Sequence, residues 1–204
     1  MTAISRRGVL LGGGAMALGF SHCADAAISI MEPEVQPQDQ LVDRALRALD
    51  LHRGHFISRD VIGIADFTEP SSTPRFYIHD VASGRNRRLL VAHGRGSDPD
   101  HSGWVERFSN SPGSAASSAG AYVTGDAYYG RHGLSRRLIG LDPENCNAEA
   151  RAIVVHAAPY VNPQIIRERG KLGRSEGCFA FDPTDLNYVL GSLGPGRMIY
   201  ADKL

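Results

Sequence analysis

The spacing of apolar residues changes along this chain, and the change predicts the order of its elements. From Leu41 to Leu49 apolar residues recur every three or four positions, which is the spacing of one helical face. Asp39 stands ahead of this stripe as a candidate N-cap, and Gly54 follows it as a stop signal. We therefore expect a helix over 39–55 that packs on the main domain.

After this helix the period falls to two, which is typical of β-strands. Short apolar or alternating runs predict strands over 61–67, 75–81, 88–92, 122–123, 137–141, 152–156, 179–181 and 197–200. The first three should form an antiparallel meander. Thr184–Leu190 reads as one or two helical turns behind Asp182 and Pro183.

A long polar stretch interrupts these runs between His93 and Gly120. It is rich in glycine and serine and has little periodicity, so we expect a surface loop system of a length that is often functional. The whole pattern predicts a mainly β class with a helix at the N-terminus.

Composition fits one globular domain. The chain has 204 residues, 42% hydrophobic and 22% charged, which suffices for a core without disulfide staples. The formal net charge is zero, so nothing favours a nucleic-acid partner. Oligomeric state is left open by these numbers.

The first residues have the features of an export signal. Ser5-Arg6-Arg7 precedes a glycine-rich apolar run over 8–20 that is too short for a stable bilayer anchor. Ala24-Asp25-Ala26 offers a small-x-small cleavage site, and His22 before Cys23 argues against a lipoprotein. We expect a cleaved signal peptide over 1–26, a linker over 27–38, a catalytic domain over 39–204 and a periplasmic location without a membrane anchor. Paired arginines are typical of the twin-arginine route, although ordinary secretory signals also carry paired basic residues.

Two residues suggest nucleophilic chemistry. His156 ends a predicted strand, and Cys178 follows Gly177 where another strand begins. A neighbouring histidine can take the thiol proton, and a glycine lets backbone amides approach an attacked carbonyl. Taken singly, Cys178 could equally be a small buried hydrophobe and His156 a structural residue.

The remaining cysteine and histidine patterns indicate no further site. Cys146 matches no catalytic pattern, and an oxidising compartment would permit a bridge between it and Cys178. The eight histidines include no His-x-x-x-His pair, and the chain has no Cys-x-x-Cys. We therefore expect no metal.

Several motifs in order resemble the murein L,D-transpeptidase catalytic domain family, a YkuD-type group of cysteine transpeptidases. They cover most of the chain from about residue 60 to 200 and lie at His93–Ser97, Phe108–Ser114, Tyr128–Ser135, Gly140–Asp142, Arg151–His156 and Gly173–Cys178. The resemblance implies a β-sandwich-like catalytic domain that needs no cofactor.

The resemblance also implies roles for individual residues. Cys178 would be the nucleophile and His156 its general base, with the backbone of Gly177 and Cys178 as oxyanion donors. Ser175 would shape the turn. Arg174 would meet a substrate carboxylate, unless it only forms an exposed ion pair. His93 is a second candidate base and a candidate substrate contact.

The implied reaction joins peptidoglycan stem peptides that contain diaminopimelate. Cys178 would form an acyl-enzyme with a donor stem, and an amine of an acceptor stem would resolve it. Glu176 stands where the family commonly has histidine, and Ala180 where it often has arginine or asparagine. These departures leave open whether the bond before D-Ala or the bond between L-Ala and diaminopimelate is cut.

Three other functions compete with this interpretation. The same site could trim stems as an L,D-carboxypeptidase, or the chain could be a non-catalytic peptidoglycan-binding module. A sortase-like order of His93, Cys178 and Arg197 is also present, although no threonine-rich strand precedes the cysteine. Papain-like enzymes are disfavoured because no histidine follows Cys178.

Overall fold

The computed structural model describes residues 37–204, so the expected signal peptide over 1–26 and all but the end of the expected linker lie outside the described residues. The first described element is helix α1, Pro37–Leu51, followed by a short 3-10 turn, η1, Arg53–His55. The helix begins two residues before the predicted start, so Asp39 lies in its first turn rather than at the N-cap. The buried stripe of α1 packs against Ile62, Ile64 and Met198 of the sheet.

Eight strands form one mixed sheet in the order β3-β2-β1-β8-β4-β5-β6-β7. Neighbouring strands are antiparallel except for the pairs β1–β8 and β6–β7, which are parallel. The predicted meander is confirmed as β1–β2–β3. The strands are β1 Val61–Asp66, β2 Phe76–Asp80, β3 Asn86–Leu89, β4 Gly120–Gly130, β5 Gly133–Gly140, β6 Val154–Ala157, β7 Phe179–Phe181 and β8 Met198–Asp202.

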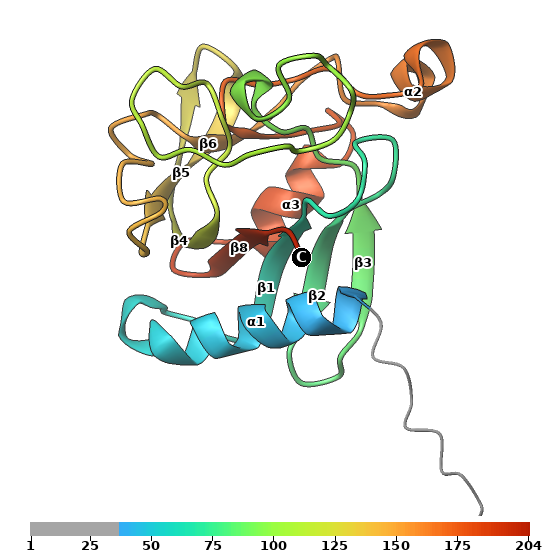
Figure 1. Cartoon of the computed structure of the whole chain (residues 1–204). Coiled ribbons are helices and arrows are strands. Elements are labelled where there is room, and N and C mark those ends of the chain that lie inside the picture. Colours follow the sequence, from blue (N-terminus) through green and yellow to red (C-terminus); the bar gives the residue numbers. More distant parts are fainter. Residues whose placement is uncertain (1–36) are drawn as a thin grey trace, which may run out of the picture. The chain divides into compact units, whose positions relative to one another are not determined.

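The sheet curls until its two ends meet. Beyond β3, the amide of Ala92 donates to the carbonyl of Ala180 in β7 at 2.9 Å. Phe76 of β2 and Phe181 of β7 then face each other across the interior, with ring centroids 4.8 Å apart. One sheet thus encloses one core as the two layers of a sandwich would, and burial of its aromatic and aliphatic side chains stabilises the fold. The mainly β class and the N-terminal helix are confirmed; α1 lies across one side of the strands in Figure 1.

Two elements differ from the sequence prediction. The β4–β5 hairpin is much longer than the two short predicted strands, and its added length is formed mainly by residues 127–130 of β4 pairing with residues 133–136 of β5, whose glycines and polar residues weaken the alternation. Helix α2, Pro163–Arg169, was not predicted. Its signals are local: the side chain of Asn162 accepts from the Ile165 amide at 2.9 Å, and Pro163 starts the helix. Figure 1 shows α2 at the periphery, whereas α3, Leu186–Ser192, packs beside the sheet.

The glycine- and serine-rich stretch between His93 and Gly120 is a loop system, as predicted, with one short 3-10 turn, η2, Arg95–Ser97. It is less exposed than expected, because Ser97, Asp98 and Val105 are buried. This loop packs against the segment that carries Cys178, where Gly94 pairs with Ser175 and Ala116 lies next to Gly177. Within residues 37–204, no helix has the length and apolar character to cross a bilayer.

Candidate active site

The segment before Cys178 is held in place by backbone pairing with the start of the long loop. The Ser175 amide donates to the His93 carbonyl, and the Arg95 amide donates to the Ser175 carbonyl, both at 2.8 Å. The Ser175 hydroxyl donates to the carbonyl of Cys178 at 2.7 Å and accepts from the Gly177 amide at 3.2 Å. Ser175 therefore closes a tight turn around the cysteine.

Gly177 lies in a conformation that few other residues can adopt. Its φ of +115° is in the region that favours glycine, and a Cβ here would approach the Ala116 carbonyl oxygen to 2.7 Å. The chain turns sharply at Gly177 and directs Cys178 toward a pocket of about 540 Å³. The Gly177 amide already has Ser175 as its partner, so it would have to leave that hydroxyl to bind an oxyanion.

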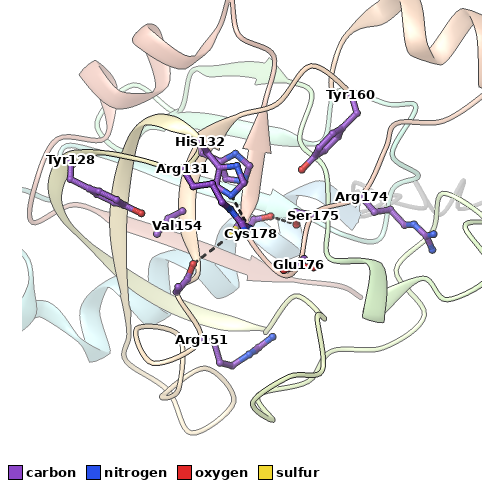
Figure 2. Close-up of a pocket in the computed structure, with 12 residues that line it drawn as sticks. Tyr128, Arg131, His132, Arg151, Val154, Tyr160, Arg174, Ser175, Glu176 and Cys178 are labelled. Carbon is purple, nitrogen blue, oxygen red and sulfur yellow. Dashed lines mark hydrogen bonds between the residues drawn. The ribbon is translucent and has the colours of Figure 1, made fainter.

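The thiol of Cys178 is partly buried in this pocket (Figure 2) and donates to the carbonyl of Ala152 at 3.5 Å. Burial raises the pKa of the thiol, and the nearby Glu176 carboxylate raises it further, against the lowering effects of the Val154 backbone and of two arginines. Because its pKa is raised, the thiol is protonated at neutral pH and needs a base to become a thiolate. Ala152, whose carbonyl accepts from the thiol, has a φ of +52°, an uncommon value for a residue with a side chain.

His156 lies on β6, next to β7, and also lines the pocket. Its Nδ1 is 2.9 Å from the carbonyl oxygen of Ala157, and because a carbonyl can only accept, Nδ1 carries the proton. In the neutral ring Nε2 then keeps a lone pair. Burial lowers the pKa of His156, so the ring is neutral at pH 7 and able to take a proton.

Cys178 and His156 line the same pocket. Within residues 37–204, however, the thiol is hydrogen-bonded to the carbonyl of Ala152 rather than to the imidazole. The raised pKa of the thiol and the lowered pKa of the imidazole favour a neutral pair over a thiolate–imidazolium pair. Proton transfer between them would require the thiol to rotate away from the Ala152 carbonyl. Such rearrangements are common, because the hydrogen bonds of a free enzyme often reach their productive geometry only when substrate binds.

The β4–β5 hairpin covers His156. The ring of His132, at the turn between the strands, stacks on His156 with centroids 4.2 Å apart and an interplanar angle of 23°. His132 and the adjacent Arg131 both contribute to the lowered pKa of His156, because a second positive charge would be repelled. Tyr128 of the hairpin and Tyr160, on the opposite wall, complete the pocket in Figure 2.

Sequence reasoning missed the role of Arg151. Its guanidinium donates to the Ser109 carbonyl at 2.7 Å, to the Ser118 hydroxyl at 2.6 Å and to the Ser114 hydroxyl at 3.2 Å, as well as to the Ala116 carbonyl. One arginine thereby fixes the loop against which Gly177 packs. The signal available was its place in the Arg151–His156 motif, but a motif alone does not tell which partners a guanidinium finds.

His93 does not reach the pocket. It has no exposed surface, its Nδ1 accepts from Arg75 at 2.6 Å, and its Nε2 is 3.1 Å from a carboxylate oxygen of Asp98. Both ring nitrogens are therefore occupied. The expectation that His93 is a second base or a substrate contact does not fit this placement, because no atom of the ring is open to a ligand.

The other predicted residues are distributed as follows. Arg174 lines the pocket, but its Nη1 donates to the backbone carbonyls of Asp98 and Pro99, and Figure 2 shows its guanidinium pointing away from Cys178. Arg197 instead pairs with Asp60 at 2.9 Å and does not line the pocket, so the sortase-like trio is not assembled.

Cys146 and Cys178 are both free, and no bridge joins them. Among the described residues, no group of three or more His, Cys, Asp or Glu side chains is arranged to hold a metal ion.

The fold and the pocket together define a class: a mainly β domain in which a cysteine and a neutral histidine line one cavity. Residues 34–201 match the family model of the L,D-transpeptidase catalytic domain, and the chain belongs to that family. No curated protein matches the sequence.

Solved structures with some likeness include an L,D-transpeptidase from Mycobacterium smegmatis, 15% identical, with a TM-score of 0.42 over 70% of this chain and 58% of that one. An L,D-transpeptidase from Xylanimonas cellulosilytica is 18% identical, with a TM-score of 0.40 over 82% and 71%. The cell shape determining protein Pgp2 from Campylobacter jejuni is 12% identical, with a TM-score of 0.43 over 72% and 48%. This chain thus spans less than two thirds of the Mycobacterium and Campylobacter structures, and the family assignment depends on the family model.

Proposed function

We propose that this chain is a peptidoglycan L,D-transpeptidase that works through a cysteine acyl-enzyme. The observation that carries the proposal is that Cys178 and His156 line one pocket, with Nδ1 of His156 held by the Ala157 carbonyl and Nε2 without a hydrogen-bond partner among residues 37–204. A neutral imidazole held in this tautomer is suited to remove a thiol proton.

In the first half of the reaction, Nε2 of His156 accepts the thiol proton while sulfur attacks the carbonyl carbon of a donor peptide bond. The Cys178 amide is the proposed oxyanion donor, and the Gly177 amide joins it if it leaves Ser175. As the tetrahedral intermediate collapses, the carbon–nitrogen bond breaks and the imidazolium returns its proton to the leaving amine. The products are a thioester on Cys178, a free amine and a neutral His156.

The donor we propose is a stem peptide that contains diaminopimelate. Arg131 and Tyr128 on one wall and Tyr160 on the other offer polar groups to a zwitterionic peptide. The bond before a terminal D-Ala is the one we expect to be cut, with the bond between L-Ala and diaminopimelate as the alternative. Arg174 could take part in carboxylate binding only through the guanidinium nitrogens that Asp98 and Pro99 leave unused.

Product analysis tests the proposal. Purified protein is incubated with disaccharide tetrapeptides, and the products are separated by chromatography and identified by mass. A dimer joined between two diaminopimelate residues, with release of D-Ala, is the expected result. Tripeptide monomers alone would mean that the site trims stems, and unchanged substrate that remains bound to the protein would mean a non-catalytic binding module.

We also propose that residues 1–26 direct export to the periplasm. The support is the arginine pair at Arg6 and Arg7 ahead of a short apolar run. A reporter fused to these residues should leave the cytoplasm, and replacement of both arginines by lysine should retain it there if the twin-arginine route is used. Export that persists in the double variant would remove the twin-arginine route and keep secretion.

A further inference from the structure

A second pocket, of about 410 Å³, adjoins the one that holds the thiol. The two pockets share Arg151 and Glu176, so they meet at the residue two positions before Cys178. A transfer reaction brings two substrates, a donor and an acceptor, to one cysteine. The pocket lined by Cys178 and His156 can hold one of them.

The second pocket carries an exposed charge pair. Arg95 Nη2 lies 3.3 Å from a carboxylate oxygen of Glu176, and their side chains are 61% and 65% exposed. The two residues come from paired backbone segments, because the Arg95 amide donates to the carbonyl of Ser175 at 2.8 Å. The backbone pairing therefore presents a positive and a negative side chain next to each other at the pocket.

This pair is free to exchange its partners, unlike the neighbouring arginines. The guanidinium of Arg151 is occupied by four acceptors of the loop, and Nη1 of Arg174 is held by two carbonyls. Within the described part of the chain, the Arg95 guanidinium has Glu176 as its partner. Exposed ion pairs contribute little stability, so a ligand with complementary charges can open this pair at small cost.

The rest of the second pocket is built from small residues. Gly113, Ala115 and Ala150 line it, and Ala115 has an uncommon φ of +52°. Arg151, which also lines this pocket, holds the wall in place because its guanidinium donates to Ser114 and Ala116, on either side of Ala115. Small side chains beside a charge pair leave room for the compact head of an amino acid.

We infer that this second pocket binds the acceptor, and that Glu176 and Arg95 together recognise an α-amino acid end that carries an ammonium and a carboxylate on one carbon. The inference rests on the proposed transpeptidase function. Diaminopimelate of an acceptor stem has such an end. Glu176 would hold the ammonium at the junction of the two pockets, and Arg95 would hold the carboxylate.

The second half of the reaction then balances. The bound ammonium gives one proton to Nε2 of His156, and the resulting amine attacks the thioester carbon on Cys178. The carbon–sulfur bond breaks as the amide bond forms. The sulfur takes the proton from the imidazolium, and the second proton of the original ammonium group that the amide does not retain passes to solvent.

Two acceptors distinguish the charges. One is a tripeptide stem that ends in diaminopimelate, and the other is the same stem with the carboxylate beside the reacting amine converted to an amide. For the wild type, we expect the amidated acceptor to have a KM about tenfold higher, the size of one charged hydrogen bond at an accessible site. Arg95→Gln should raise the KM of the unmodified acceptor by a similar factor and remove the preference between the two. Glu176→Gln should raise the KM of both acceptors.

Acylation by a tetrapeptide donor in the absence of acceptor is measured on every protein, and Glu106→Gln, an exposed carboxylate outside both pockets, is the charge-matched control. Wild-type protein that never acylates would refute the proposed function itself. Normal acylation with acceptor KM values unchanged in both pocket variants would overturn the acceptor site. Acylation slowed as much as transfer would also overturn it, since the charge pair would then serve the donor.

Discussion

Two buried histidines of this chain differ in how much hydrogen-bonding capacity the fold leaves them. His93 and His156 have exposed fractions of 0% and 2%, so burial does not distinguish them. Both ring nitrogens of His93 are occupied, by Arg75 and Asp98. His156 lines a pocket and uses Nδ1 for the Ala157 carbonyl, and its Nε2 has no hydrogen-bond partner within residues 37–204. Hydrogen-bonding capacity that the fold leaves unused is therefore the better guide to chemistry.

The two regions are also connected. The buried cluster of Arg75, His93 and Asp98 fixes the start of the long loop, whose backbone pairs with Ser175 near Cys178. The cluster thus supports the loop backbone next to the site and offers no group for the reaction. Variants in the pocket should change rate with little change in stability, and variants in the cluster should do the reverse.

The largest expected effect is that of Cys178→Ser. A serine hydroxyl is far less acidic than a thiol, so turnover and labelling by thiol probes should fall to background while the melting temperature stays close to that of the wild type. Cys146→Ser, at the exposed free cysteine, is the matched control and should keep both. An essential Cys146 with a dispensable Cys178 would contradict the site.

The next effect is that of His156→Ala, measured as the single-turnover rate of acylation. Loss of a positioned base should slow acylation by roughly 10²–10⁴-fold. His93→Gln removes a histidine that faces no cavity, and its acylation rate, measured on the folded fraction, should fall far less. Equal losses in the two variants would remove the distinction between the two histidines.

Arg75→Met tests the cluster by chemical denaturation. Arg75 is fully buried, and its loss leaves the Val91 carbonyl and Nδ1 of His93 without their donor and removes a buried positive charge near Asp66 and Asp98, so the free energy of unfolding should drop by about 3–5 kcal/mol. Arg59→Met breaks an exposed pair with Asp50 and should change stability by less than about 1 kcal/mol. Similar small losses in both variants would show that the cluster contributes no more than a surface pair.

The pH dependence of stability gives a smaller effect with a definite sign. Burial and the positive charge of Arg75 lower the pKa of His93 to about 4, from 6.5 in the unfolded chain. Between these values the unfolded state binds more protons, so stability is complete above pH 6.5 and falls by up to about 3 kcal/mol as the pH drops to 4. The free energy of unfolding of the wild type and of His93→Gln is measured by denaturation at several pH values in this window. The loss of stability toward pH 4 should be smaller in the variant. The same slope of unfolding free energy against pH in both proteins would mean that groups other than His93 cause the pH dependence.

The sequence predicted those parts of the molecule that depend on local pattern. The α1 stripe, the β1–β3 meander and the turn around Gly177 follow from spacing or from glycine at one position. The full length of the β4–β5 hairpin was not predicted, because residues 127–130 and 133–136, which pair mainly with each other, include glycines and polar residues that break the alternation typical of a strand. Local pattern also could not tell His93 from His156, because the difference lies in the partners that the fold brings to each ring.

The most direct test of the account is intact-protein mass spectrometry after mixing wild-type protein with a purified tetrapeptide stem and no acceptor. We expect an adduct on Cys178 with the mass of the stem through diaminopimelate, absent from Cys178→Ser. An adduct that ends at L-Ala would keep the mechanism and move the cut to the bond before diaminopimelate. No adduct from any stem or carbapenem, on protein shown to be folded and reduced, would contradict the central claim that Cys178 is an acylated nucleophile.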